Sequence, residues 1–189
     1  SKPTHPATVH FPITATLATA ALDGVYFLSQ YGPTTSIVAS ACKLPHPAPP
    51  KRVQLTQTHV KTLDIALSPS LFPILSYYTT ILTLLFSVPA VATGILQLLP
   101  LIKRDGFNTK KAKVGAAHAA INYMTTAGAA YNWYTRRGNQ GFVPSDTNVL
   151  ISSLVAAPAT VFAASLGGSL VYVYGMGIGG GGARAKKAQ

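Results

Sequence analysis

The stretch that decides the fold is LFPILSYYTTILTLLFSVPAVATGILQLLPLI, residues 71–102, which contains no charged side chain. A helix needs about 20 apolar residues to cross the hydrocarbon core of a bilayer, and this stretch is longer than that. Pro89 lies inside it, Pro73 near its start and Pro100 near its end. Because proline disturbs helical hydrogen bonding, we predict a kinked or tilted transmembrane helix that projects beyond the lipid.

Three further stretches are long and apolar enough to cross a membrane, at about residues 11–30, 114–134 and 149–174. None of them alternates between apolar and polar residues as a barrel strand does. The sequence therefore predicts an all-α polytopic membrane protein with four transmembrane helices in a bundle. We expect residues 1–175 to form this single domain, with a Pro-rich loop at 31–60 and a Gly-rich, then basic tail at 176–189.

The composition agrees with a membrane protein and excludes several other classes. Hydrophobic residues make up 48% of the chain and charged residues only 10%, against about 25% charged residues in ordinary globular domains. The four acids are all aspartates, and Cys42 is the single cysteine. This balance excludes a disordered tail or an acidic scaffold, and one cysteine excludes a secreted module held together by disulfides.

The net charge of +11 comes from small clusters of Lys and Arg that flank the apolar stretches. Such cations anchor helices at lipid headgroups, so we expect contacts with lipids and no nucleic-acid binding. With four spans, both termini and the turn at 103–113 lie on one side of the membrane. That side would carry nine cations and the opposite side six. The positive-inside rule then places the termini in the cytoplasm, or in the matrix for a mitochondrial protein.

Two histidines form the most suggestive pair in the sequence. His10 opens the first span and His118 lies one turn inside the third, so both are expected at similar depth on the same side. Two histidines on facing helices could bind haem b, which makes a haem-bearing redox protein the alternative function. A structural role is favoured, in which His118 bonds to Asn122 four residues on. We therefore predict no cofactor.

Asp23 is an acid inside the first span, and acids in that position are candidates for function by default. It lies about 20 Å along the helix axis from His10, so the two cannot share a site. A buried structural pair is favoured over a proton relay, because the other spans offer few polar groups for a relay. The candidate partners are Tyr26, Tyr77, Tyr78, Tyr131, Lys61 and Arg136. No catalytic or metal-ligating set is predicted from the scattered acids.

The opening HPATVHFP, residues 5–12, resembles the start of a family of small four-span membrane proteins of uncharacterised function. Members share a His-Pro-x-x-Val-His-Phe-Pro start, an Asp late in the first helix and a His near the start of the third. Asp23 and His118 occupy those positions here, the latter within AHAAIN at 117–122. The resemblance covers roughly residues 5–125.

Within that family, TGILQLLPLIKRDG at 93–106, the absence of Glu and the basic tail are similar to a small accessory subunit of fungal mitochondrial complex I, the NADH:ubiquinone oxidoreductase. The resemblance implies a non-catalytic, cofactor-free subunit in the mitochondrial inner membrane, and for such a subunit the positive-inside rule places the termini in the matrix. Its expected partners are the other membrane subunits of the complex, against whose membrane arm it packs, and lipids. No catalytic residue comes with this resemblance.

Overall fold

The computed structural model describes residues 4–30 and 70–176, and every regular element in these ranges is helical. The Pro-rich loop predicted at 31–60 and the tail from residue 177 lie outside the described residues. The elements are α1 (Thr4–Thr8), α2 (His10–Ser29), α4 (Leu71–Asp105), α5 (Lys110–Arg136), η1 (Gln140–Phe142), α6 (Asp146–Val149), η2 (Leu150–Ala156) and α7 (Ala157–Tyr172).

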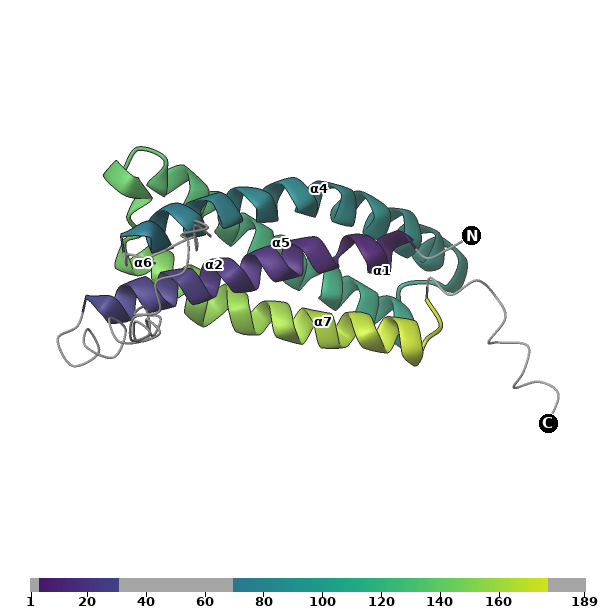
Figure 1. The fold of residues 1–189 in the computed structure, drawn as a ribbon. Helices are drawn as coiled ribbons and strands as arrows, with labels where there is room; N and C mark the ends of the chain where they lie inside the picture. Colours follow the sequence, from purple (N-terminus) through teal and green to yellow (C-terminus); the bar gives the residue numbers. More distant parts are fainter. Residues whose placement is uncertain (1–3, 31–69, 177–189) are drawn as a thin grey trace, which may run out of the picture.

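The long helices run up and down in one bundle, as Figure 1 shows. α2 packs against α4, α4 against α5, and α5 against α7, while η2 also packs against α2 and so brings the last helix back to the first. α1, the α4–α5 turn and the end of α7 lie together at one end of the bundle. The predicted all-α bundle is confirmed.

Three of the helical stretches are long and apolar enough to cross a membrane: His5–Ser29, Leu71–Asp105 and Asp146–Tyr172. The fourth predicted span is the helix α5, which lies inside the bundle but is less apolar than the other three. Lysines at its start and asparagines and tyrosines along its length account for that difference. The described part of the chain is thus a helical membrane protein of three strongly apolar helices and a more polar fourth.

Capping side chains set helix starts that hydropathy alone places too late. α5 begins at Lys110, four residues before the predicted start, because Thr109 accepts a hydrogen bond from the Ala112 amide at 3.3 Å. The last helical stretch begins at Asp146, where Ser145 and Asn148 form a reciprocal capping box. Polar first turns of this kind add length to a helix without adding to its apolar stretch.

The prolines leave α4 continuous, and the irregular turns occur in the last helix. α4 runs through Pro89 and Pro100 as one helix of 35 residues. In the last helix, η2 is a π-helix whose wider turns are closed by the bond from the Ala157 amide to the Ser152 carbonyl. This segment stands just before Pro158, which has no amide hydrogen to donate. π-Helical turns are rare and frequently lie at functional sites.

The interior contains many polar side chains, and much of the outside is apolar. Leu85, Leu96, Val88 and Met124 are among the large side chains that are exposed. Apolar side chains such as Phe72, Ala163 and Leu170 share the interior with side chains that carry hydroxyl or amide groups, which are Thr19, Ser76, Thr80, Thr83, Ser87, Asn132, Asn148, Ser152 and Thr160. Such a distribution suits a bundle surrounded by lipid, where hydrogen bonds between helices and close packing of small residues hold the helices together.

Candidate functional site

A buried ion pair joins the first and third long helices. Asp23 lies in α2, and Arg136 is the last residue of α5. The Arg136 Nη1 lies 3.1 Å from Oδ1 and 3.3 Å from Oδ2 of Asp23. Neither side chain has any exposed surface. The pair therefore lies wholly inside the protein.

Two serines complete the hydrogen bonding of the carboxylate. The Ser76 hydroxyl of α4 donates to Asp23 Oδ1, and the Ser152 hydroxyl of η2 donates to Oδ2 at 2.7 Å. Each carboxylate oxygen thus accepts from one hydroxyl as well as from the guanidinium. Because a buried charge without such partners is strongly unfavourable, these serines are part of the ion-pair site.

The guanidinium is equally well satisfied. Its Nη2 donates to the Pro73 carbonyl at 3.0 Å, and its Nε donates to the Phe142 carbonyl at 3.0 Å. Phe142 has a positive φ of 54°, unusual for a residue other than glycine. Its ring stacks on Tyr77 with the ring centroids 4.0 Å apart and the planes nearly parallel. The turn after α5 therefore folds back over the ion pair and closes it from that end.

A second polar group beside the ion pair joins α5 to the start of the last helix. The Asn132 amide donates to the Asn148 carbonyl oxygen at 3.1 Å, and the Asn148 amide donates to Asn132 Oδ1 at 3.0 Å and Thr135 Oγ1 at 2.8 Å. Both asparagines are buried. In the described part of the chain, every buried side-chain nitrogen or oxygen has a hydrogen-bond partner. At this end of the bundle the buried polar side chains thus form one network in which every hydrogen-bonding group has a partner, and such a network serves to hold the helices in place.

Arg136 is one of the six partners that the sequence allowed for Asp23. Lys61 lies outside the described residues, and the four tyrosines do not bond to the carboxylate. The contributions of Ser76 and Ser152 were not expected from the sequence. Serine is common in transmembrane helices, and which serine faces an acid depends on how three helices are rotated against one another.

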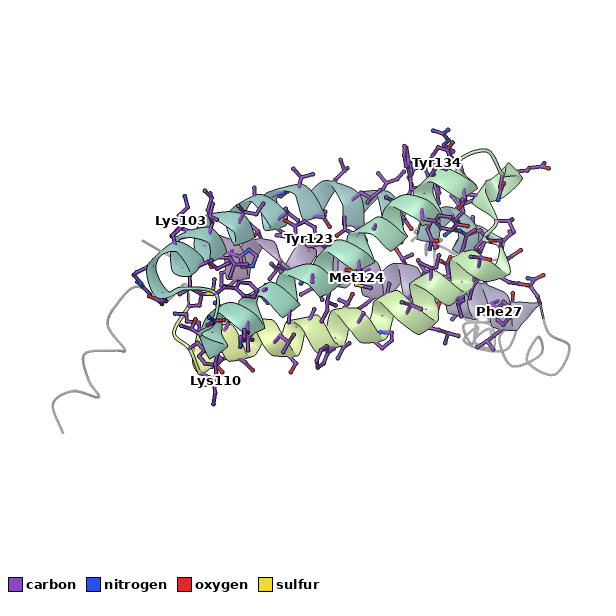
Figure 2. All side chains as sticks on the ribbon, turned by 180° about the vertical axis from the view of Figure 1, so that it is seen from behind. Phe27, Lys103, Lys110, Tyr123, Met124 and Tyr134 are labelled. Carbon is purple, nitrogen blue, oxygen red and sulfur yellow. The ribbon has the colours of Figure 1, made fainter. Side chains whose placement is uncertain are left out.

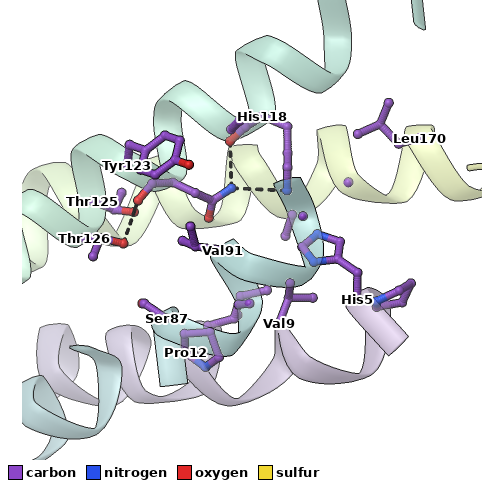
Figure 3. A pocket seen from close by; sticks show the side chains of 18 of the residues that line it. His5, Val9, Pro12, Ser87, Val91, His118, Tyr123, Thr125, Thr126 and Leu170 are labelled. Atoms are coloured by element: carbon purple, nitrogen blue, oxygen red, sulfur yellow. Dashed lines mark hydrogen bonds between the residues drawn. The ribbon is translucent and has the colours of Figure 1, made fainter. Parts of the chain in front are cut away.

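His118 lies toward the other end of the bundle and bridges two helices. Its Nδ1 lies 2.8 Å from the Ala163 carbonyl oxygen of α7. The Asn122 amide donates to the His118 carbonyl at 2.7 Å and lies 3.3 Å from His118 Nε2, so the contact predicted from the spacing is present. These hydrogen bonds are drawn in part in Figure 3.

The structure does not bring His10 and His118 together. His10 is exposed, and its Nδ1 lies 2.6 Å from the Pro6 carbonyl. His5 takes the place expected for His10, with its ring centroid 6.4 Å from that of His118. Five residues correspond to about 140° around a helix. A helix that presents His5 to the bundle therefore points His10 away from it.

His5 and His118 line a cavity of about 200 Å³. Figure 3 shows both side chains projecting into it, His5 from α1 and His118 from α5. The Asn122 side chain is the nearest amide, and the remaining lining is largely aliphatic or small, including Val9, Pro12, Ile13, Val91, Leu98 and Leu170. Since one water needs only about 15 Å³ of such space, the cavity is large enough for a small organic ligand.

The family model for a predicted membrane protein, DUF2231, matches residues 1–180. The chain belongs to this family. The expected membership of a family of small membrane proteins is thereby confirmed, and the DUF2231 match includes both the ion pair and the histidine-lined cavity. No curated protein and no solved structure matched the chain.

The described residues of this DUF2231 chain contain no cluster of side chains that could bind a metal ion. No three of its His, Cys, Asp and Glu side chains in the ranges 4–30 and 70–176 come close enough to hold a metal ion. The two sites therefore differ in what they can do. The ion pair is closed and saturated with hydrogen bonds, whereas the two histidines line a cavity.

Proposed function

We propose that this protein is a non-catalytic accessory subunit of mitochondrial respiratory complex I, packed against the membrane arm of that complex. The observation that carries the proposal is the outward face of α5. That face differs in kind from the outward faces of the other long helices, and the difference favours contact with protein over contact with lipid.

The outward face of α5 combines small residues with tyrosines. Met124 and Tyr134 are 73% and 59% exposed, and Figure 2 shows both projecting from the bundle. Other exposed residues of this α5 face include Ala117, Ala120, Tyr123, Ala127, Ala130 and Tyr131. Small residues let helix backbones approach closely inside membranes, and Tyr is enriched at protein interfaces. The α5 face therefore suits another transmembrane helix.

The outward faces of α2, α4 and α7 have the composition expected against lipid. Exposed residues there include Leu17 and Val25 of α2, Leu85 and Leu96 of α4, and Phe162 of α7. Leu, Val, Phe and Ile are the residues that insert most favourably into a bilayer. A subunit with three lipid-type faces and one face of small and aromatic residues suits a position at the edge of a larger membrane assembly.

The choice of complex I rests on the sequence resemblance. It draws on residues 93–106, on the absence of Glu and on the basic tail. These features support a place in the mitochondrial inner membrane, with the other membrane subunits of the complex and their lipids as partners. The alternative of haem b held by His10 and His118 has no support from the geometry, because His10 lies outside the cavity.

A native gel tests the proposal. Solubilised mitochondrial membranes are probed for this chain and stained for NADH oxidation, and the chain is expected in the NADH-oxidising band. Ala127→Leu combined with Ala130→Leu should release the chain from that band, because the added side chains prevent close helix approach. Ala21→Leu, the same type of substitution at one exposed position of α2, should leave it there. Migration of the unaltered chain only as a small free species would refute the assignment to complex I.

A further inference from the structure

The cavity lined by His5 and His118 has a hydroxyl lining that all four long helices contribute. Its hydroxyl side chains include Thr16 from α2, Ser87 from α4, Thr126 from α5 and Thr160 from α7. Figure 3 shows Ser87, Thr125 and Thr126 on the side of the cavity away from His5. The lining therefore changes from imidazole and aliphatic groups near α1 to hydroxyl groups further inside the bundle.

A second, smaller space continues the cavity toward the ion pair. Its volume is about 20 Å³, and it shares Thr16, Thr83 and Thr125 with the larger cavity. It is also lined by Ser152, whose hydroxyl donates to Asp23 Oδ2 at 2.7 Å. The two spaces thus form one series that leads from the α1 end of the bundle to the buried carboxylate.

The helix α4 measures the length of this series. Gly94 lines the larger cavity, and the Ser76 hydroxyl donates to Asp23 Oδ1. The 18 residues from position 76 to position 94 correspond to about 27 Å at 1.5 Å per residue. The hydrocarbon core of a bilayer is about 30 Å thick. The series of spaces therefore extends over most of a membrane's thickness.

The series narrows toward the ion pair and ends there. Along the inward face of α4 the exposed fraction falls from 7% at Ser87 to 4% at Thr83, 1% at Thr80 and 0% at Ser76. Arg136, beside Ser76, has no exposed surface. The Asp23–Arg136 pair is therefore the closed end of the series.

The hydroxyls that line these spaces present acceptors to whatever occupies them. A hydroxyl has one proton to donate, and here it goes to a carbonyl of the same helix: Ser87 to Thr83 at 2.7 Å, Thr83 to Thr79 at 3.1 Å, and Thr16 to Pro12 at 2.8 Å. The remaining lone pairs can only accept. A lipid chain offers no donor and a quinone carbonyl offers none, whereas each water molecule offers two.

The volumes also suit water. One water needs about 15 Å³ of such space and two to four polar partners, and cavities that stay dry are apolar. The smaller space, at about 20 Å³, has room for one water among threonine, serine and asparagine side chains, and the larger, at about 200 Å³, has room for a connected chain. We propose that the two spaces form an aqueous half-channel, filled by water from the α1 end and sealed by the Asp23–Arg136 pair.

The open end of the half-channel lies where the bundle meets the headgroups. Gln97 and Met176 line the larger cavity, and the α4–α5 turn and the end of α7 lie at that end of the bundle (Figure 1). Figure 2 shows Lys103 and Lys110 on either side of that turn. Lysines at the ends of transmembrane helices mark the boundary with water. The proposed assembly into complex I does not require this half-channel, so the two proposals are independent.

The test is cysteine accessibility of the full chain in lipid bilayers, in a Cys42→Ser background that removes the single native thiol. Ser87→Cys places a thiol in the half-channel. Leu85→Cys is the matched control, because Leu85 is 60% exposed on the outside of the same helix at nearly the same depth. Modification by 2-aminoethyl methanethiosulfonate is followed by intact mass. Because only the thiolate reacts and apolar surroundings suppress it, we expect Ser87→Cys to react about tenfold faster or more.

A third position tests the seal. Ser76→Cys lies beside the Asp23 carboxylate and is expected to react as slowly as Leu85→Cys. Circular dichroism checks that each variant is folded, and labelling after denaturation checks that each thiol is intact. Reaction of Ser76→Cys as fast as that of Ser87→Cys would overturn the closed end.

Two adjacent alanines test whether the cavity is the route. Ala119 lines the cavity, whereas Ala120 is exposed on the outward face of α5. In the Ser87→Cys chain, Ala119→Leu should slow labelling several-fold by filling the space, and Ala120→Leu should not. Equal rates in these two chains would overturn the route. Ser87→Cys that reacts no faster than Leu85→Cys would overturn the half-channel itself, leaving a cavity that is dry or filled by a lipid chain. These outcomes do not depend on where the chain migrates on a native gel.

Discussion

Arg136 reaches Asp23 across 113 residues of chain, with Nη1 3.1 Å from Oδ1 and no exposed surface on either side chain. The two residues belong to helices that are not consecutive, α2 and α5. Hydroxyls from α4 and η2 bind the same carboxylate, and carbonyls of Pro73 and Phe142 bind the guanidinium. One ion pair therefore fixes the mutual position of every long helix at this end of the bundle.

Arg136→Met is expected to lower the free energy of unfolding by about 3–5 kcal/mol, because it leaves the Asp23 carboxylate buried without its counter-charge. The measurement is an unfolding titration in detergent micelles. The neighbouring Arg137→Met is the control, since Arg137 is exposed and rests on the Tyr134 ring at 4.2 Å. We expect a loss below about 1 kcal/mol there. Equal losses at both positions would contradict the role of the ion pair.

Asp23→Leu combined with Arg136→Met should be more stable than either single variant. Removing both charges eliminates the uncompensated one, and buried pairs replaced by apolar residues often lose little stability. The same titration, run on the two singles and the double, gives the coupling energy. Additive losses would show that the two side chains act separately.

Ser152→Ala should cost about 1.5–3 kcal/mol, the range for a hydrogen bond to a charged group. The lost hydroxyl donates to Asp23 Oδ2 at 2.7 Å. Ser169→Ala is the matched change in the same last helix, where the hydroxyl donates only to its own helix at Ser165. Thermal unfolding in micelles should separate the two variants. A Ser152→Ala protein as stable as Ser169→Ala would remove this serine from the site.

Asn148→Asp separates helix capping from contact between helices. The aspartate keeps an acceptor for the Ser145 amide but loses the donor to Asn132 Oδ1 and Thr135 Oγ1. We expect a loss of about 1–3 kcal/mol from the unsatisfied oxygens that then face each other. Asp146→Asn, an exposed change in the first turn of α6, should cost less than about 1 kcal/mol through the helix dipole. Circular dichroism during heating provides the comparison.

Alanine substitutions at two adjacent glycines are expected to have opposite effects on stability. A Cβ at Gly167 would lie 3.1 Å from the His118 ring, whereas a Cβ at Gly168 would have no neighbour within 4 Å. Gly167→Ala should therefore displace His118 and destabilise the bundle. Gly168→Ala should be neutral or gain up to about 1 kcal/mol from helix propensity. Melting temperatures of the two variants decide this, and equal shifts would argue against the tight contact at Gly167.

The helices were largely predictable from the sequence because apolar length is a local property. The start of α5 was placed late because Thr109 and the lysines after it are polar, although they form its cap and first turn. The π-helix before Pro158 could not be predicted, since hydropathy does not distinguish π-helical from α-helical turns; it contains Ser152, which donates to Asp23. Local sequence determines that a helix forms, whereas packing determines how its turns are spaced.

The site was predictable only as a set of possibilities. A buried Asp23 needs a partner, and Arg136 was among six candidates. Choosing Arg136 would have required knowing how three helices are rotated relative to one another. His10 was preferred to His5 because the first helix was taken to begin near residue 11. The structure adds the short helix α1 before it, and that turn of chain presents His5 to His118. A helix start misplaced by a few residues therefore changed which histidine enters the cavity.

The ion pair also constrains how the chain is made. Asp23 belongs to the first long helix, and Arg136 arrives with the third, more than a hundred residues later in synthesis. A charged side chain within a transmembrane helix opposes its insertion, so Asp23 weakens α2 as an independent span although the helix is long and apolar enough to cross a membrane. Insertion of α2 is therefore coupled to that of α5, and a chain truncated before Arg136 would expose an unneutralised acid to quality control. The contact that stabilises the complete bundle is therefore missing from an incomplete chain, and its absence distinguishes the two.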